Sequence, residues 1–401
     1  MPPRTILYTG KGGVGKTSVA ACTARRLAAD GLRTLVLSTD PAHSLSESLQ
    51  TDLDGTVREV APRLWGQEVN AQQELERHWS ASAHWISDLL AQRGVDPIAA
   101  AELTVPPGMD ELFSLLQLTR HSEVGEFDAI VVDCAPTSET LRLLSFPELA
   151  RWWLDRVVPR ERQLMATARP LLRTLLDIGL PDEAVMAEVE RLVRNLIAMR
   201  EMLADHRYVT IRLVMTPDRM VVGEAMRTFT YLNLYGYLTD AVIVNRIFPD
   251  AVAGTYFGPW RELQQQQLEL VGEAFAPVPV LRAPFFDAEV IGPAMLDRLA
   301  AELFPSGDPA AVLHDRLAHE LTMSDGEATL RIDLPFAGRE DVGLEKIGAE
   351  LIVRVDGRKR MIALPPSLAG FRTTGAKLAD GSLRVSFARA DKRLPAEEPA
   401  L

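Results

Sequence analysis

The sequence predicts an α/β protein with a doubly wound, mostly parallel sheet, and three observations lead to this prediction. First, a helix-like run at 16–29 separates two short apolar runs, which is a βαβ opening. Second, two long stretches at 70–122 and 147–206 have helical spacing and indicate a helical subdomain inserted into the sheet domain. Third, short runs typical of buried strands recur at 5–10, 34–38, 129–133, 211–215, 241–245 and 278–281.

The pattern changes to alternating, strand-like spacing near the C-terminus. Asp356-Gly357 and Asp380-Gly381 stand where type I′ hairpin turns are expected, because this turn needs two residues that tolerate positive φ. A separate small β-domain is therefore predicted. The expected division is a main domain at 1–304, a linker with one short helix at 305–326, the β-domain at 327–390 and a disordered tail at 391–401.

The amino-acid composition disfavours several classes of function. The net charge of -12 disfavours nucleic-acid binding as the main task, since that task needs a basic surface. Two cysteines without C-x-x-C spacing cannot build a disulfide framework. The N-terminus has no apolar signal core, and no run approaches the roughly 18 apolar residues of a membrane span. We therefore expect a cytoplasmic protein with no nucleic-acid partner.

Residues 10–17 read GKGGVGKT and match the phosphate-loop pattern G-x-x-x-x-G-K-[ST] between a strand and a helix. Glycines let backbone N–H groups turn toward phosphate oxygens, and the following helix adds its positive dipole end. Lys16 is expected to reach the β- and γ-phosphates, and the Thr17 hydroxyl to bind Mg²⁺. A chance Gly-rich turn is the alternative, at about one per cent from average residue usage. The predicted nucleotide-binding loop is Gly10, Lys11, Gly12, Gly13, Val14, Gly15, Lys16, Thr17 and Ser18.

Lys11 makes this loop a deviant Walker A type of P-loop NTPase. No other lysine occurs between Lys16 and Lys346, so two lysines in eight residues suggest that an ammonium group is needed at both positions. A second loop lysine cannot easily fold back onto the γ-phosphate that Lys16 serves. We therefore expect Lys11 to reach the nucleotide of a facing subunit, like an arginine finger given in trans. The alternative is a solvated loop lysine.

Two aspartates follow predicted strands. Asp40 comes after the second strand and Asp133 ends the third, and the carboxyl ends of parallel strands converge on the ligand crevice. Asp133 is expected to act on Mg²⁺ or its waters, and Asp40 to orient the attacking water. Each could alternatively cap a helix. His43 receives no catalytic role.

Together these residues resemble the anion-transporting ATPases, a family that includes the arsenite-pump ATPase and the guided-entry ATPases that deliver tail-anchored membrane proteins. The resemblance covers about residues 4–300. Its motifs are GKGGVGKT at 10–17, DPAHSL at 40–45, DCAPTSETLR at 133–142, TPDRM at 216–220, VNRIFPD at 244–250 and APFFDAEVIG at 283–292.

The resemblance implies a homodimer that sandwiches ATP and Mg²⁺, with Lys11 contacting across the interface. It assigns the switch I role to Asp40 and the switch II role to Asp133 together with Pro136 and Thr137. It also implies that Asn245, Pro284 and Phe285 hold the adenine.

The chain departs from the family at several positions. Cys134, Ser138 and Glu139 replace the usual Thr, Gly and His of switch II, so the coupling of hydrolysis to movement can differ. The C-x-x-C pair that binds a shared zinc is absent, so no zinc is expected. Arsenite needs several convergent thiolates, and Cys22 and Cys134 do not supply them. An arsenite pump is therefore the disfavoured alternative.

The β-domain resembles the α-crystallin domain appended to some family members, which implies a small β-sandwich. The I-x-I tail that builds large assemblies is missing, so large oligomers are not expected. A packing module and a chaperone surface both remain open as its role.

The second helical stretch is rich in large apolar residues. Methionines suit the binding of varied hydrophobic segments because they adapt their shape, although such stripes usually form helix-bundle core. The candidate groove residues are Trp152, Trp153, Leu164, Met165, Leu172, Leu176, Met186, Met199 and Met202.

The leading hypothesis is thus a dimeric ATPase that shields hydrophobic segments of membrane-protein clients. A metalloid-efflux ATPase and a regulatory ATP-binding dimer without a client are the alternatives. The sequence does not identify a membrane receptor.

Overall fold

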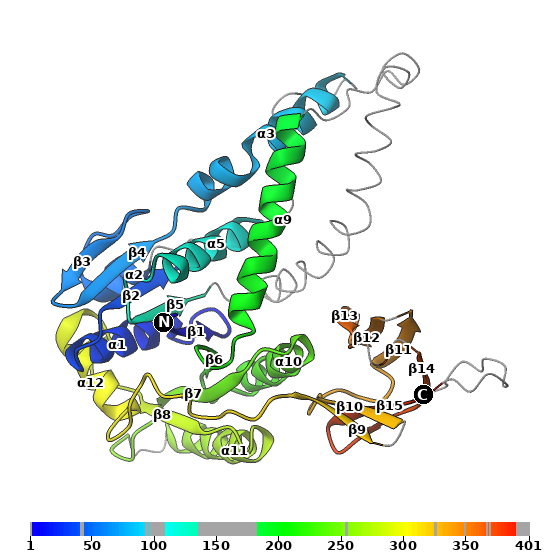
Figure 1. The fold of residues 1–401 in the computed structure, drawn as a ribbon. Coiled ribbons are helices and arrows are strands. Elements are labelled where there is room, and N and C mark those ends of the chain that lie inside the picture. Colours follow the sequence, from blue (N-terminus) through cyan, green and yellow to red (C-terminus); the bar gives the residue numbers. More distant parts are fainter. Residues whose placement is uncertain are drawn as a thin grey trace.

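An eight-stranded sheet forms the centre of the main domain (Figure 1). The computed structural model describes residues 2–40, 44–92, 96, 109–134, 183–252, 256–324, 327–348, 350–365, 368 and 370–389. The strand order is β3-β4-β2-β5-β1-β6-β7-β8, and all pairs are parallel except β3 with β4. The strands are β1 (Arg4–Thr9), β2 (Thr34–Ser38), β3 (Arg58–Ala61), β4 (Leu64–Glu68), β5 (Ala129–Asp133), β6 (Val209–Met215), β7 (Thr239–Ile247) and β8 (Val280–Pro284). The predicted doubly wound, mostly parallel sheet is confirmed.

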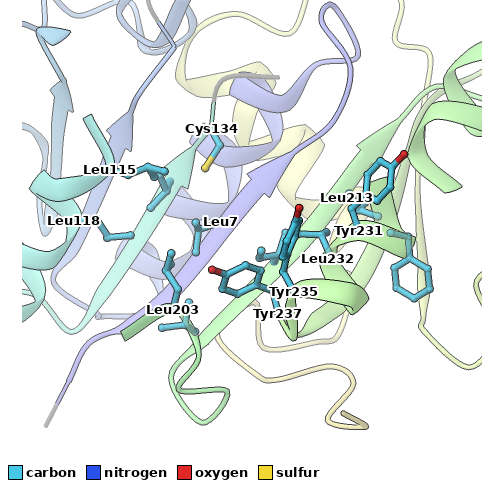
Figure 2. Close-up of a cluster of buried hydrophobic side chains, with 14 of the residues drawn as sticks. Leu7, Leu115, Leu118, Cys134, Leu203, Leu213, Tyr231, Leu232, Tyr235 and Tyr237 are labelled. Carbon is cyan, nitrogen blue, oxygen red and sulfur yellow. The ribbon is translucent and has the colours of Figure 1, made fainter. Parts of the chain in front are cut away.

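Helices cover both faces of this sheet, and alternate side chains of each strand enter opposite layers. On β1, Leu7 packs in one hydrophobic cluster and Ile6 and Tyr8 pack in the other. One layer contains α1 (Lys16–Ala29), α2 (Ser44–Leu49) and α12 (Gly292–Leu303). The other contains α5 (Met109–Val124), α9 (Glu183–Leu203), α10 (Arg219–Tyr235) and α11 (Gly258–Ala274). Figure 2 shows part of this second cluster, with side chains from β1, β6, α5 and α10.

A helical arm formed by α3 (Ala71–Gln92) and α9 projects from the sheet (Figure 1). The carboxylate of Glu188 on α9 joins the two helices, because its Oε2 accepts hydrogen bonds from the backbone N–H and the hydroxyl of Ser82, both at 2.7 Å. Met199 is fully buried in the core cluster, so it is a core residue here rather than a groove residue. Met186 and Met202 are partly exposed. The other groove candidates, Trp152, Trp153, Leu164, Met165, Leu172 and Leu176, lie outside the described residues.

Two antiparallel sheets form the C-terminal domain, with orders β14-β15-β10-β9 and β11-β12-β13. Their inward side chains share one apolar core, as expected for a sandwich. The turns at Asp356-Gly357 and Asp380-Gly381 have positive φ at both residues, which confirms the predicted type I′ hairpins. The strands are β9 (His319–Ser324), β10 (Glu327–Asp333), β11 (Val342–Ile347), β12 (Glu350–Val355), β13 (Arg358–Ala363), β14 (Phe371–Ala379) and β15 (Ser382–Arg389).

The linker differs from its prediction. The described residues 305–324 contain no helix, and β9 occupies the end of the segment expected to be linker. The physical reason is that arginines of the main sheet bind its backbone: Arg4 Nε donates to the carbonyl of Ala310 at 2.6 Å, and Arg212 donates to that of Pro309 at 2.9 Å. These tertiary contacts fix the path of the segment and override its local tendency to form a helix.

The β-domain packs on the C-terminal half of α10. Leu234 of α10 is fully buried within the core of the β-domain, and Arg360 donates to its carbonyl. The Tyr231 hydroxyl donates to Asp356 at 2.7 Å, and the Arg358 guanidinium lies 4.2 Å from the centre of the Tyr231 ring. One helix therefore contributes to both domains.

A buried ion pair lies beneath the linker. Arg212 on β6 and Asp240 on β7 are both fully buried, with Nε 3.1 Å from Oδ1. Arg212 also donates to the Tyr8 hydroxyl at 3.2 Å and to the linker carbonyls of Pro309 and Ala311. Desolvation lowers the pKa of Arg212, but the interactions with Tyr8 and Asp240, including hydrogen bonds to both, together outweigh it and raise the pKa above its usual value, so Arg212 stays charged.

We expect Asp240→Asn to lower the free energy of unfolding by about 3–5 kcal/mol, because it leaves the Arg212 charge buried without its counter-ion. Denaturant unfolding measures this loss. The matched control is Asp128→Asn, which weakens the solvent-exposed pair with Arg33 and should change stability by less than about 1 kcal/mol. Equal losses in the two variants would contradict the assignment of a special role to the buried pair.

Candidate active site

The phosphate loop joins β1 to α1, and two of its glycines are required by contacts with neighbouring strands. A Cβ on Gly10 would lie 2.1 Å from the carbonyl oxygen of Val214 on β6. Gly15 has φ +93°, and a Cβ there would lie 2.4 Å from Nδ2 of Asn245 on β7. No side chain fits at either position, so the backbone of the loop approaches the sheet edge closely.

Lys16 and Thr17 begin α1 at the base of the loop. Lys16 is only 4% exposed, and its Nζ donates to the carbonyl of Lys11 at 3.3 Å. The Thr17 hydroxyl donates to Oδ2 of Asp133 at 2.7 Å and lies 3.0 Å from the Ser44 hydroxyl. The structure thus brings the loop and the end of β5 together, as the sequence predicts.

Asp133 is fully buried at the end of β5. Desolvation raises the pKa of its carboxyl to about 6, against the opposing effects of the Thr17 hydrogen bond and the Lys16 charge. Its Oδ1 atom is buried and has no hydrogen-bond partner among the described residues. A carboxylate oxygen of this kind beside the Thr17 hydroxyl fits the oxygen ligands that Mg²⁺ prefers.

Asp40 lies two residues beyond β2 and is partly buried. Its backbone N–H donates to the Ser38 hydroxyl at 3.2 Å, and the same hydroxyl donates to Oδ2 of Asp133 at 3.4 Å. The Asp40 charge is one of the influences that raise the pKa of Asp133, so the two carboxylates share one site. Pro136, Thr137 and His43 lie outside the described residues.

Asn245 braces the phosphate loop. Its Nδ2 donates to the carbonyl of Val14 at 2.9 Å, and its Oδ1 accepts from the backbone N–H of Arg246 at 2.9 Å. The side chain is 7% exposed. A contact between this amide and adenine remains a prediction.

A groove of about 970 Å³ runs from the outer side of the loop to α11. Three phenylalanine rings line it, with the Phe248 ring centre 5.8 Å from the centres of both Phe257 and Phe285. Pro284, at the end of β8, is half-buried and does not line the groove. Five groove residues received no role from the sequence: Arg246, Phe248, Tyr256, Phe257 and Trp260. The first two lie within the VNRIFPD motif, and the other three belong to the aromatic run that follows it.

Lys11 lines the same groove. Its Nζ lies 3.7 Å from Oε2 of Glu224 on α10, and both side chains are more than a third exposed. A pair of this kind contributes little stability and is easily exchanged. The ammonium group is therefore free to take another partner.

Both cysteines are buried, and burial raises the pKa of each thiol. Within the described ranges, no group of three or more His, Cys, Asp or Glu side chains is arranged to hold a metal ion. No helix in the described part of the chain is both long enough and apolar enough to span a bilayer.

Comparisons with known proteins found two matching family models and several similar chains. A family model described as anion-transporting ATPase matches residues 3–305, and one described as an HSP20-like domain found in ArsA matches residues 325–387. The "Putative arsenical pump-driving ATPase" of Chlorobaculum tepidum is 36% identical over 390 residues, which are 96% of each chain. The "Putative arsenical pump-driving ATPase 1" of Aquifex aeolicus is 33% identical over 392 residues, 95% of this chain and 99% of that one. The "ATPase GET3B" of Arabidopsis thaliana is 31% identical over 306 residues, 71% of this chain and 74% of that one.

Proposed function

This chain belongs to the anion-transporting ATPase family, and from that premise we propose an Mg²⁺-dependent, homodimeric ATPase that shields hydrophobic segments of membrane-protein clients. The ATPase activity in this proposal rests on the buried Asp133 carboxylate, which accepts a hydrogen bond from Thr17 beside Lys16. These three groups come from two elements that meet at the carboxyl edge of the sheet.

Each residue of the site has a distinct task in ATP hydrolysis. The loop amides and the Lys16 ammonium group hold the β- and γ-phosphates at the positive end of α1. Thr17 and Asp133 would hold Mg²⁺, the latter through water, and the bound ion supplies positive charge against the phosphate oxygens. Asp40 orients the water that attacks the γ-phosphate.

Two features of the groove face support a homodimer. Among the described residues, Lys11 forms one weak ion pair, with Glu224, so its ammonium group is available to a nucleotide held by a second subunit. Beside it, Tyr256, Trp260 and Leu263 are 76%, 52% and 52% exposed, and such apolar patches mark interaction surfaces.

The helical arm supports the client-shielding part. At the foot of α9, beside the sheet, Met202 lines a surface hollow of about 450 Å³ together with Ala198, Thr119 on α5 and Pro2. Met186 is partly exposed on the same helix. Flexible thioether side chains on an amphipathic helix suit hydrophobic segments of varied shape.

A metalloid-pump ATPase is the second candidate, and the names of two relatives favour it. The chain has two cysteines, Cys22 and Cys134, and both are buried. Their raised pKa keeps them as thiols, whereas metalloid binding uses exposed thiolates. The chemistry of this chain therefore favours the client-shielding function.

We expect Asp40→Asn to bind ATP and lose hydrolysis, which holds the dimer in its ATP-bound state. In that state the variant should keep a 20-residue leucine-alanine helix soluble and co-purify with proteins that have one hydrophobic helix. The probe is a fluorescent version of that peptide, followed by gel filtration with and without Mg-ATP. Lys16→Ala, which should not bind ATP, is the control. If Asp40→Asn binds ATP but not the peptide, client shielding is wrong and a regulatory ATPase remains.

A further inference from the structure

Strand β7 contains a β-bulge at the nucleotide site. The register of β7 with β8 runs Val242 with Val280, Ile243 with Leu281 and Val244 with Arg282, and then shifts to Ile247 with Pro284. Asn245 and Arg246 together therefore oppose the single residue Ala283.

The bulge forces Arg246 into a left-handed conformation with φ +59°, which a non-glycine residue adopts only at a cost in free energy. Two hydrogen bonds hold it there. Its backbone N–H donates to Oδ1 of Asn245 at 2.9 Å, and its carbonyl accepts from Nε2 of Gln264 at 3.3 Å. Strain that is fixed in this way is common where a side chain is aimed at a ligand.

Because of the bulge, the side chains of Asn245 and Arg246 can both lie near the phosphate loop. In a regular strand, consecutive side chains point to opposite faces of the sheet. Here Asn245 reaches the phosphate loop, and Arg246 lines the groove beside the same loop. Among the residues that the structure describes, none forms a hydrogen bond or ion pair with the Arg246 guanidinium group.

The composition of the groove indicates which part of the nucleotide Arg246 meets. Residues 11–14 of the phosphate loop line one side of the groove, whereas Lys16, Thr17 and Asp133, which form the phosphate and metal end of the site, do not line it. The rings of Phe248, Phe257 and Phe285 do. A planar guanidinium group beside aromatic rings is suited to stacking on a purine base.

We propose that Arg246 is a nucleotide-binding residue that stacks on the base and so holds the adenosine half of ATP and ADP. This inference rests on the proposed ATP site. Arg246 then contributes to the affinity for the nucleotide and to recognition of its base, and takes no part in cleavage of the γ-phosphate.

Calorimetric titration of the full chain with ADP and with tripolyphosphate, which lacks adenosine, tests the proposal. Arg246→Ala should raise the Kd for ADP about tenfold and leave the Kd for tripolyphosphate unchanged. In hydrolysis assays the KM for ATP should rise and kcat should stay constant. Arg246→Lys should lose as much ADP affinity as Arg246→Ala, because it keeps the charge but not the planar group.

Two further variants guard against effects on folding. Arg246→Gly suits φ +59°, so its Tm should be at least that of the wild type while its ADP affinity still falls about tenfold. Arg227→Ala removes an exposed arginine of α10 outside the groove and should change neither Kd.

Equal weakening for ADP and tripolyphosphate, recovery by Arg246→Lys, or unchanged ADP binding in Arg246→Ala would each overturn the proposal. If the wild type binds neither ADP nor tripolyphosphate, the proposed ATPase function itself is wrong. The two failures are therefore distinguishable.

Discussion

Replacing Lys11 by alanine is expected to lower ATP hydrolysis by about 100-fold or more while ATP still binds. The reason is that Lys16, Thr17 and the loop backbone hold the phosphates, whereas the Lys11 ammonium group would stabilise the transition state from the facing subunit. Steady-state hydrolysis and the Kd for ATP separate the two effects.

Glu224→Gln is the matched control for this change, because it removes the in-chain partner of Lys11 and keeps the lysine. Its hydrolysis rate should equal or exceed that of the wild type, since Lys11 is then released from its pair. Hydrolysis by Lys11→Ala at the wild-type rate would show that the alternative, a solvated loop lysine, is correct.

Replacing Asp133 by asparagine is expected to abolish hydrolysis and to stabilise the nucleotide-free protein. The carboxylate would hold Mg²⁺ through water, so its loss should lower the rate by about 100-fold or more. Burial raises its pKa from 3.8 to about 6, so keeping it ionised at pH 8 destabilises the folded state by about 3 kcal/mol. Asparagine keeps the acceptor for Thr17 and removes the buried charge.

Because burial raises the pKa of Asp133, the difference in stability between Asp133→Asn and the wild type depends on pH. Between the unfolded pKa near 4 and the folded pKa near 6, the folded state binds the proton more tightly, so the stability of the wild type falls as pH rises. The advantage of Asp133→Asn should therefore grow from pH 4 to pH 6 and stay constant above. Denaturant unfolding without nucleotide or metal at pH 5 and pH 8 measures the difference between variant and wild type. An advantage that does not change with pH, or a variant less stable than the wild type, would show that the buried Asp133 charge does not destabilise the folded state.

The fold could be predicted from the sequence wherever local pattern decided it. The central strands are apolar on both faces, and the hairpin turns carry Asp-Gly at both residues that need positive φ. Strand β3 was missed because it is short, polar and largely exposed, and so has no buried-strand pattern. The expected linker helix is absent from 305–324 because Arg4 and Arg212, some 100 to 300 residues earlier in the chain, bind its carbonyls.

In the candidate site, too, local sequence pattern predicted some features, whereas tertiary contacts decided the others. Lys16, Thr17 and Asp133 were predictable together, because the motif fixes the loop and parallel strands bring their carboxyl ends to one edge. The contact of Asn245 with Val14 and the aim of Arg246 depend on a bulge in β7, which alternation in sequence does not reveal. The pairing of Lys11 with Glu224 depends on where α10 packs, which is a tertiary property.

A mixed dimer shows whether Lys11 completes the active site of a second subunit. Lys11→Ala and Lys16→Ala chains with different tags are co-expressed, and the heterodimer is purified through both tags. Its Lys11→Ala subunit keeps a complete phosphate site and receives Lys11 from the other chain. We predict about half of the wild-type hydrolysis rate, because one of two sites works, while each homodimer is inactive. A heterodimer as inactive as both homodimers would contradict a lysine given in trans.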